Sequence, residues 1–236
     1  MGIFDKLVDR ILSSIGFDLD FTIELRGEAF NSINESLVVG RRPQKDGIQA
    51  LKEAGITHVV SCLAESERPK MLFLQDDFPT LFLPIHDGVH ENISSLFPRW
   101  FDYVSQAKES HSKAKVYVHC EVGVSRSATM AIALLMKEQS LDFLEAFTQV
   151  RSKRPGVLPN IGFASQLQHY ELELKTQANS QRDFSSLALY LHKICNTPIE
   201  IELLEEALQR HDYDAFQAIQ NLFGGEIPRV VQGVRI

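Results

Sequence analysis

The segment VYVHCEVGVSRSAT, residues 116–129, joins an apolar run to a helix-like stretch through a short loop. The apolar residues 116–118 predict a buried strand that ends at His119 and Cys120. Helical character begins near Arg126. A thiol between the end of a strand and the start of a helix lies where unpaired backbone N–H groups converge, and these groups favour anions. We therefore expect an anion-binding loop with a nucleophile at its floor.

The loop has the residue types that a bound phosphate requires. Gly123 lets the backbone approach a tetrahedral dianion closely, and the planar fork of Arg126 suits two phosphate oxygens at once. Ser127 can donate a hydrogen bond to the sulfur of Cys120, which the loop favours as the nucleophilic thiolate, and His119 is suited to orient backbone. The expected phosphate-binding residues are Glu121, Val122, Gly123, Val124, Ser125 and Arg126.

Strands and helices alternate on both sides of this loop. Apolar runs predict four strands, at residues 36–40, 57–62, 81–85 and 115–120. Periodicity predicts helices at residues 47–55, 94–110, 126–138, 141–152 and 160–174, and the Pro and Gly of residues 153–160 predict a loop. Short apolar strands that alternate with helices are typical of an α/β fold with a mostly parallel central sheet flanked by helices.

The two ends of the chain differ from this pattern. Residues 3–15 predict an amphipathic helix, which we expect to pack on its own domain rather than on a membrane because it lacks a basic polar face. Residues 175–183 are polar and predict a linker. Beyond them, helical patterns at residues 184–195, 199–210 and 213–223 predict a C-terminal helical extension, either a packing bundle or a surface for a protein partner.

Composition excludes several classes of protein. The 236 residues carry a net charge of -7, which argues against binding to nucleic acid or to anionic membranes. The three cysteines, Cys62, Cys120 and Cys195, are too few and too scattered for a disulfide framework or a zinc site. We therefore expect no metal and no cofactor, a reducing cytoplasmic location and no stable membrane insertion.

The pattern His119-Cys120-x-x-Gly123-x-Ser125-Arg126-Ser127 resembles the signature of cysteine-based protein phosphatases, in the form that the dual-specificity subfamily uses. The resemblance extends from about residue 34 to residue 170 and includes the segments LVVG, GITHVVSC and RPGVLPNIGFASQLQHYE. It implies an atypical member with the cysteine phosphatase fold. The expected domains are an N-terminal helix and lead-in at 1–30, a catalytic domain at 31–175 and a helical extension at 176–236.

The resemblance implies that phosphate is transferred to Cys120 and that water then hydrolyses the phosphocysteine. The leaving oxygen needs a proton, and the family takes it from an aspartate whose position Asp87 matches. Asp76 and Asp77 are rivals, but they precede the third strand and should lie at its other end. Other titratable residues near Asp87 do not match the family position; they are His86, His90 and Glu91.

Three further expectations concern support, regulation and substrate. Asn160 matches a family asparagine that steadies the phosphate loop, and it could also cap the next helix. Cys62 ends a strand as Cys120 does, so it is either a buried hydrophobic residue or a redox partner of the nucleophile. The predicted substrate is a phosphoprotein with phosphotyrosine, phosphoserine or phosphothreonine. The alternatives are a phosphate-binding protein without turnover and a phosphatase of a non-protein ester.

Overall fold

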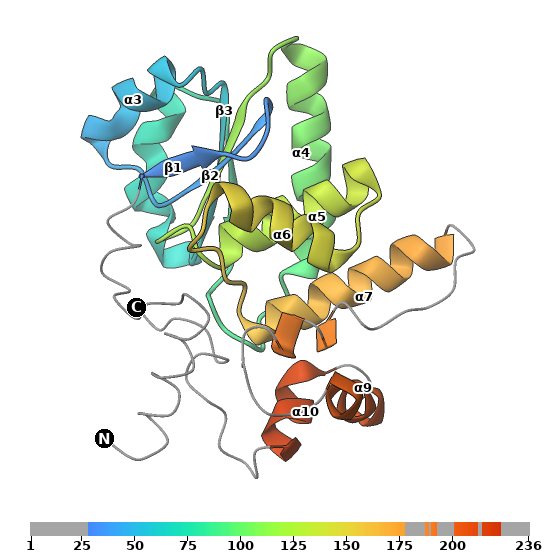
Figure 1. Ribbon diagram of the computed structural model, residues 1–236. Helices are drawn as coiled ribbons and strands as arrows, with labels where there is room; N and C mark the ends of the chain where they lie inside the picture. Colours follow the sequence, from blue (N-terminus) through green and yellow to red (C-terminus); the bar gives the residue numbers. More distant parts are fainter. Residues whose placement is uncertain (1–27, 178–186, 189, 193–200, 212–213, 223–236) are drawn as a thin grey trace.

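The computed structural model describes residues 28–177, 187–188, 190–192, 201–211 and 214–222 (Figure 1). Within them the chain forms a five-stranded sheet with the strand order β1-β2-β5-β3-β4. The parallel strands are β2 (Leu37–Gly40), β5 (Val116–His119), β3 (His58–Leu63) and β4 (Thr80–Pro84). β1 (Phe30–Ser32) pairs antiparallel with β2 at the edge. The predicted α/β fold with a mostly parallel sheet is confirmed.

Helices cover both faces of the sheet (Figure 1). On one side lie η1 (Lys45–Gly47), α3 (Ile48–Glu53) and the long 3₁₀ helix η2 (Glu65–Asp76). The other elements are η3 (Ser94–Leu96), α4 (Phe97–Ser110), α5 (Arg126–Gln139), α6 (Phe143–Lys153), α7 (Ile161–Gln177), α9 (Ile201–Arg210) and α10 (Ala215–Leu222). Among the described helices, none is long and apolar enough to cross a membrane. The expected helix at residues 3–15 lies outside the described residues.

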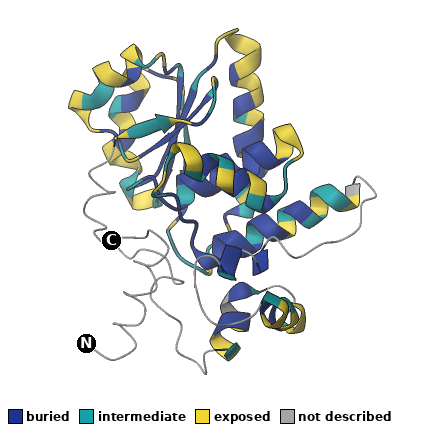
Figure 2. Cartoon of the chain, in the orientation of Figure 1, coloured by how far each residue is buried: buried dark blue, intermediate teal, exposed yellow. Residues whose placement is uncertain are grey.

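The inner parallel strands β2, β5 and β3 are buried along their whole length, as the continuous apolar runs predicted, whereas β4 at the edge of the sheet is mostly half-buried (Figure 2). Because side chains alternate along a strand, β2 directs Val38 toward α3 and η2, and Val39 toward α5. Helix α5 lies against the second face, and all of its residues from 127 to 136 are buried. A helix enclosed on all sides gives the loop before Arg126 a fixed support.

Two elements were missed at the sequence level. β1 has only three residues and its burial is partial, so it shows no apolar run. η2 carries Pro69 and several charged residues, and only Met71 and Leu74 are buried, so its pattern does not repeat with the period of an α-helix. Pro98 lies in the first turn of α4, where its missing N–H costs no hydrogen bond within the helix.

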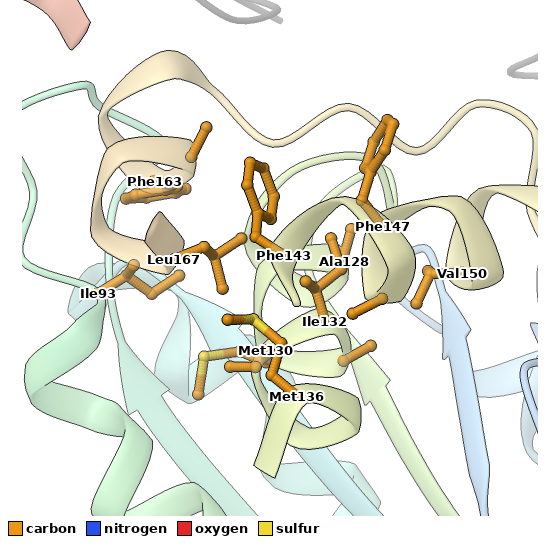
Figure 3. Packing of buried hydrophobic residues seen from close by; sticks show 14 of the residues in the cluster. Ile93, Ala128, Met130, Ile132, Met136, Phe143, Phe147, Val150, Phe163 and Leu167 are labelled. Atoms are coloured by element: carbon orange, nitrogen blue, oxygen red, sulfur yellow. The ribbon is translucent and has the colours of Figure 1, made fainter. Parts of the chain in front are cut away.

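The C-terminal extension packs on the main domain instead of standing apart. Three residues of the predicted linker, 175–177, belong to α7, and residues 178–183 lie outside the described residues. Beyond the linker, buried residues join the same hydrophobic cluster as α5, α6 and α7; they include Leu187, Tyr190, Leu191, Leu204 and Leu208. Figure 3 shows part of this cluster, with Phe143 of α6 facing Leu167 and Phe163 of α7. The domain division at residue 175 stays a prediction.

Removal of residues 176–236 tests that division. The truncated chain keeps every residue proposed below for chemistry, but it loses the Tyr190 ring that covers Phe143 and Phe147. Burial of one large apolar side chain stabilises by about 2 kcal/mol, so we expect the free energy of unfolding to fall by roughly 3 kcal/mol or more. Urea unfolding of the full-length and truncated proteins measures this loss. Equal unfolding midpoints would show that residues 31–175 fold independently.

Candidate active site

The sulfur of Cys120 lies at the floor of the loop between β5 and α5. Cys120 is buried, with 1% of its surface exposed. Its Sγ accepts hydrogen bonds from the backbone N–H of Gly123 at 3.2 Å and from the hydroxyl of Ser127 at 3.3 Å. Both donors are placed to stabilise negative charge on the sulfur.

Each carbonyl from residue 120 to residue 125 accepts a hydrogen bond from outside the loop. His119 Nδ1 donates to the carbonyl of Cys120, and the N–H of Arg42 donates to that of Glu121. The Arg154 guanidinium donates to the carbonyls of Val122 and Gly123. The N–H groups of Leu158 and Thr129 donate to the carbonyls of Val124 and Ser125. In a trans peptide the N–H points opposite to the carbonyl. Since the carbonyls are held on the outside, the N–H groups are left to face the interior of the loop.

Arg154 and Gly123 fix the shape of this loop. Arg154 donates from Nε to the carbonyl of Gly123 at 2.8 Å and from its terminal nitrogen to that of Val122 at 3.1 Å. Burial lowers the pKa of Arg154 from its ordinary high value, yet the guanidinium stays charged. Gly123 has a φ of 81°, and a Cβ there would lie 2.5 Å from the backbone of Gly40. A side chain at this position would therefore both strain and displace the loop.

Arg126 and Asp87 meet at the mouth of the loop. Arg126 Nε lies 3.5 Å from Asp87 Oδ2 and has no hydrogen-bond acceptor among the described residues. A terminal nitrogen of Arg126 donates to the carbonyl of Ile85 at 3.4 Å. A buried guanidinium nitrogen without an acceptor is costly, so this donor is available for an anionic ligand.

The other carboxylate oxygen of Asp87 is held by two donors. Oδ1 accepts from the hydroxyl of Ser125 at 2.7 Å and from the side-chain amide of Asn160 at 2.8 Å. Asn160 also caps α7, because its Oδ1 accepts from the N–H of Phe163 at 3.0 Å. Both functions that the sequence left open for Asn160 thus have contacts. A Cβ at Gly162 would lie 1.8 Å from the carbonyl oxygen of Val89, so the first turn of α7 packs directly on the Asp87 loop.

His119 lies behind the loop and does not face its mouth. Its Nε2 lies 2.8 Å from the Ser61 hydroxyl, and its Nδ1 lies 3.3 Å from the carbonyl of Cys120. Burial, together with the nearby positive charges of Arg42 and Arg126, lowers the pKa of His119 to about 3. The ring is therefore neutral at neutral pH, with Nδ1 donating to the carbonyl and Nε2 accepting from Ser61.

The remaining candidates lie elsewhere. Asp77 follows η2 and precedes β4, so it lies at the N-terminal ends of the parallel strands, opposite the Cys120 loop. It pairs with Lys52 at 2.5 Å, in a shallow cavity of about 540 Å³ with His58 and His111. Asp76 is exposed in the same turn. His86 is exposed, and Glu91 contributes its backbone carbonyl to a hydrogen bond from Gln166.

Cys62 lies beside the nucleophile candidate. Ser61 of β3 pairs with His119 of β5, so Cys62 and Cys120 follow at the same level of the sheet and belong to one cluster. Both are free thiols. Burial raises the pKa of the Cys62 thiol well above its ordinary value, and the charge of Cys120 raises it further. Cys62 therefore stays protonated at neutral pH.

Sequence reasoning missed Arg154, Ser61 and the carbonyls that hold the loop. Arg154 stands inside residues 153–160, whose Pro and Gly content predicts a loop. Its basic side chain, directly before Pro155, was the one available signal, and such a signal does not identify a partner. The contacts of Arg154 span 31 and 32 positions in sequence.

The fold and the loop define a class, the proteins with a cysteine phosphatase fold. The chain is similar to the human tyrosine phosphatase-like serine/threonine/tyrosine-interacting protein, with 32% identity and a TM-score of 0.56 over 60% of this chain and 95% of that one. It is also similar to human DUSP28, with 28% identity and a TM-score of 0.56 over 63% of this chain and 97% of that one.

A family model described as "Dual specificity phosphatase, catalytic domain" matches residues 37–173, and the chain belongs to this family. Dual specificity protein phosphatase 1B of Arabidopsis thaliana is 32% identical over 152 residues, which cover 64% of this chain and 87% of that protein. Dual specificity protein phosphatase 14 of Mus musculus is 36% identical over 60% of this chain and 69% of that protein. The match to human dual specificity protein phosphatase 16 is 34% identical but spans only 22% of that protein. The chain is a protein phosphatase.

Proposed function

We propose that the enzyme hydrolyses phosphotyrosine and phosphoserine or phosphothreonine in proteins through a phosphocysteine intermediate. The observation that carries this proposal is the buried Cys120 sulfur inside a loop whose carbonyls are all held outward, with Arg126 at its mouth, whose Nε has no hydrogen-bond acceptor among the described residues. The inward N–H groups of residues 121–126 and Arg126 would bind the phosphate oxygens.

The proposed reaction has two steps. The Cys120 thiolate attacks phosphorus, the bond to the substrate oxygen breaks, and Asp87 gives that oxygen its proton. Water then attacks phosphorus, Asp87 takes a proton from the water, and the bond to sulfur breaks. The hydrogen bond from Ser127 to the sulfur, at 3.3 Å, would stabilise the departing thiolate.

The loop composition supports protein substrates over polyphosphorylated lipids. Apart from Arg126, the side chains of the loop supply no cation, since its variable positions are Glu121, Val122 and Val124. Extra phosphates on a ring would need additional positive charge. Glu121 instead pairs with Arg42 at 3.1 Å, and Arg42 also pairs with Glu67 at 2.7 Å. The group formed by Arg42, Glu67 and Glu121 has no net positive charge, which disfavours a polyanionic substrate.

A comparison of substrates tests the proposal. We expect release of inorganic phosphate from a chromogenic aryl phosphate and from peptides with phosphotyrosine, phosphoserine or phosphothreonine. Phosphatidylinositol phosphates in detergent micelles should be poor substrates. Binding of the phosphopeptides without release of phosphate would support the non-catalytic alternative, and preference for the lipid would support a non-protein substrate.

Cys62 is proposed as a redox partner of the nucleophile. Peroxide would convert the Cys120 thiolate to a sulfenic acid, and the Cys62 thiol would then displace water to form a disulfide. Because burial raises the pKa of Cys62, we expect this second step to be slow. Mild peroxide should inactivate the enzyme reversibly, and Cys62→Ser should make dithiothreitol recover less activity. Cys195→Ser is the control, with recovery expected as in the wild type.

Peptide mapping of the oxidised protein decides this prediction. A crosslinked peptide pair that contains Cys62 and Cys120 is expected. Cys120 found only as sulfinic or sulfonic acid, with Cys62 a free thiol, would leave Cys62 as a buried hydrophobic residue and nothing more.

A further inference from the structure

Among the described residues of the C-terminal extension, Tyr190 contacts the segment that leads into the candidate active site. Its hydroxyl donates to the carbonyl of Pro159 at 2.8 Å, and the ring is 99% buried, with 1% of the residue exposed. Pro159 directly precedes Asn160, which holds Asp87. The extension is thus two hydrogen-bonded contacts away from the residue proposed as the acid.

One peptide unit links these contacts. The carbonyl of Pro159 and the N–H of Asn160 belong to the same planar group and point to opposite sides of it. The carbonyl accepts from Tyr190, and the N–H donates to the Ser125 hydroxyl at 3.2 Å. Ser125 in turn donates to Asp87 Oδ1 at 2.7 Å. The three donors are the Tyr190 hydroxyl, the Asn160 N–H and the Ser125 hydroxyl. They follow one another in the same direction, toward the Asp87 carboxylate, and aligned hydrogen bonds polarise one another.

Tyr190 is itself held in place by the main domain. Its ring packs on Phe143 with 5.0 Å between ring centroids and edge-on against Phe147 at 4.9 Å. The backbone N–H of Leu187, one turn earlier, donates to the side chain of Gln168 on α7 at 2.8 Å. An anchor fixed by packing and by hydrogen bonds can hold the Pro159 carbonyl in one orientation.

We propose that Tyr190 is a positioning residue for Asp87, and that the C-terminal extension thereby supports the proton-transfer step. This inference rests on the proposed function, in which Asp87 protonates the leaving oxygen. Tyr190 orients the peptide that aligns Ser125 and the Asn160 side chain, and these two donors fix the Asp87 carboxyl group. Phosphate binding by the loop does not depend on this chain of contacts.

The variant Tyr190→Phe in the full-length protein removes only the hydroxyl and keeps the buried ring. For alkyl and phenyl phosphates, whose leaving oxygens need a proton, we expect kcat to fall by roughly three- to tenfold, as for the loss of one hydrogen bond between neutral groups. KM should not change. For a dinitrophenyl phosphate, whose leaving group needs no proton, kcat/KM, which reports the transfer of phosphate to Cys120, should stay at the wild-type value, which also shows that the variant is folded.

Tyr103→Phe is the matched control. The Tyr103 hydroxyl also donates to a proline carbonyl, that of Pro79, at 2.8 Å, but at the opposite edge of the sheet. This variant should lower kcat for neither class of leaving group. Equal losses for good and poor leaving groups in Tyr190→Phe, or no loss at all, would show that Tyr190 only stabilises the fold.

A double substitution separates this inference from the proposed function. In an Asp87→Asn background, Tyr190→Phe should have no further effect on kcat for phenyl phosphate, because the residue through which it acts is already disabled. Additive losses would refute the role of Tyr190 while leaving Asp87 as the acid. If Asp87→Asn alone shows no dependence on the leaving group, the acid assignment fails, and the role of Tyr190 fails with it.

Discussion

Cys120→Ser is expected to abolish hydrolysis of phosphate esters while their binding remains. A serine hydroxyl stays protonated at neutral pH and is a far weaker nucleophile than a thiolate, so we expect kcat to fall by roughly three decades or more. The groups proposed to bind phosphate are the backbone N–H groups of the loop and Arg126, and the substitution leaves them in place. The loop carbonyls also keep their outside donors, so its shape should persist.

Two measurements check this expectation. Phosphate release measures turnover, and fluorescence anisotropy of a labelled phosphopeptide measures binding to wild type and variant. Cys195→Ser, assayed under reducing conditions, controls for the general loss of a thiol and should match wild type. Hydrolysis by Cys120→Ser within about tenfold of the wild-type rate would contradict a covalent intermediate on this residue.

The candidate site could be predicted where its residues are contiguous. The strand, loop and helix from residue 116 to residue 129 follow one another without interruption, so local pattern places the thiol, the glycine and the arginine together. Asp87 is 33 positions before Cys120 in the printed sequence, and it was assigned through a family resemblance and through the topology of parallel strands. The structure brings it to 3.5 Å from Arg126.

Contacts between distant segments were beyond the sequence. Tyr190 was expected only to belong to a helix, because periodicity identifies a buried face but not the carbonyl that a buried hydroxyl will meet. The polar composition of residues 175–183 predicted a linker, although α7 continues to Gln177. Charged residues on the exposed side of a helix give the same composition as a loop, so polarity alone does not locate the end of the helix.

Asp87→Asn is expected to lower kcat by roughly two to four decades for phenyl and alkyl phosphates, the usual range for loss of a general acid. Asparagine has nearly the same shape, and its side-chain oxygen can still accept hydrogen bonds from Ser125 and Asn160, as Asp87 Oδ1 does. The loop should therefore keep its geometry while the transferable proton is lost. Steady-state rates across a series of leaving groups measure the effect.

The dependence on the leaving group is what identifies the acid. A dinitrophenolate departs without a proton, so the loss of kcat/KM, which reports the transfer of phosphate to Cys120, should nearly vanish in Asp87→Asn for that substrate. Asp77→Asn is the matched control, because Asp77 carries the same carboxylate at the opposite edge of the sheet, where it pairs with Lys52. It should leave the whole series unchanged. An equal loss for all leaving groups in Asp87→Asn would mean that Asp87 acts by holding Arg126 and that another group supplies the proton.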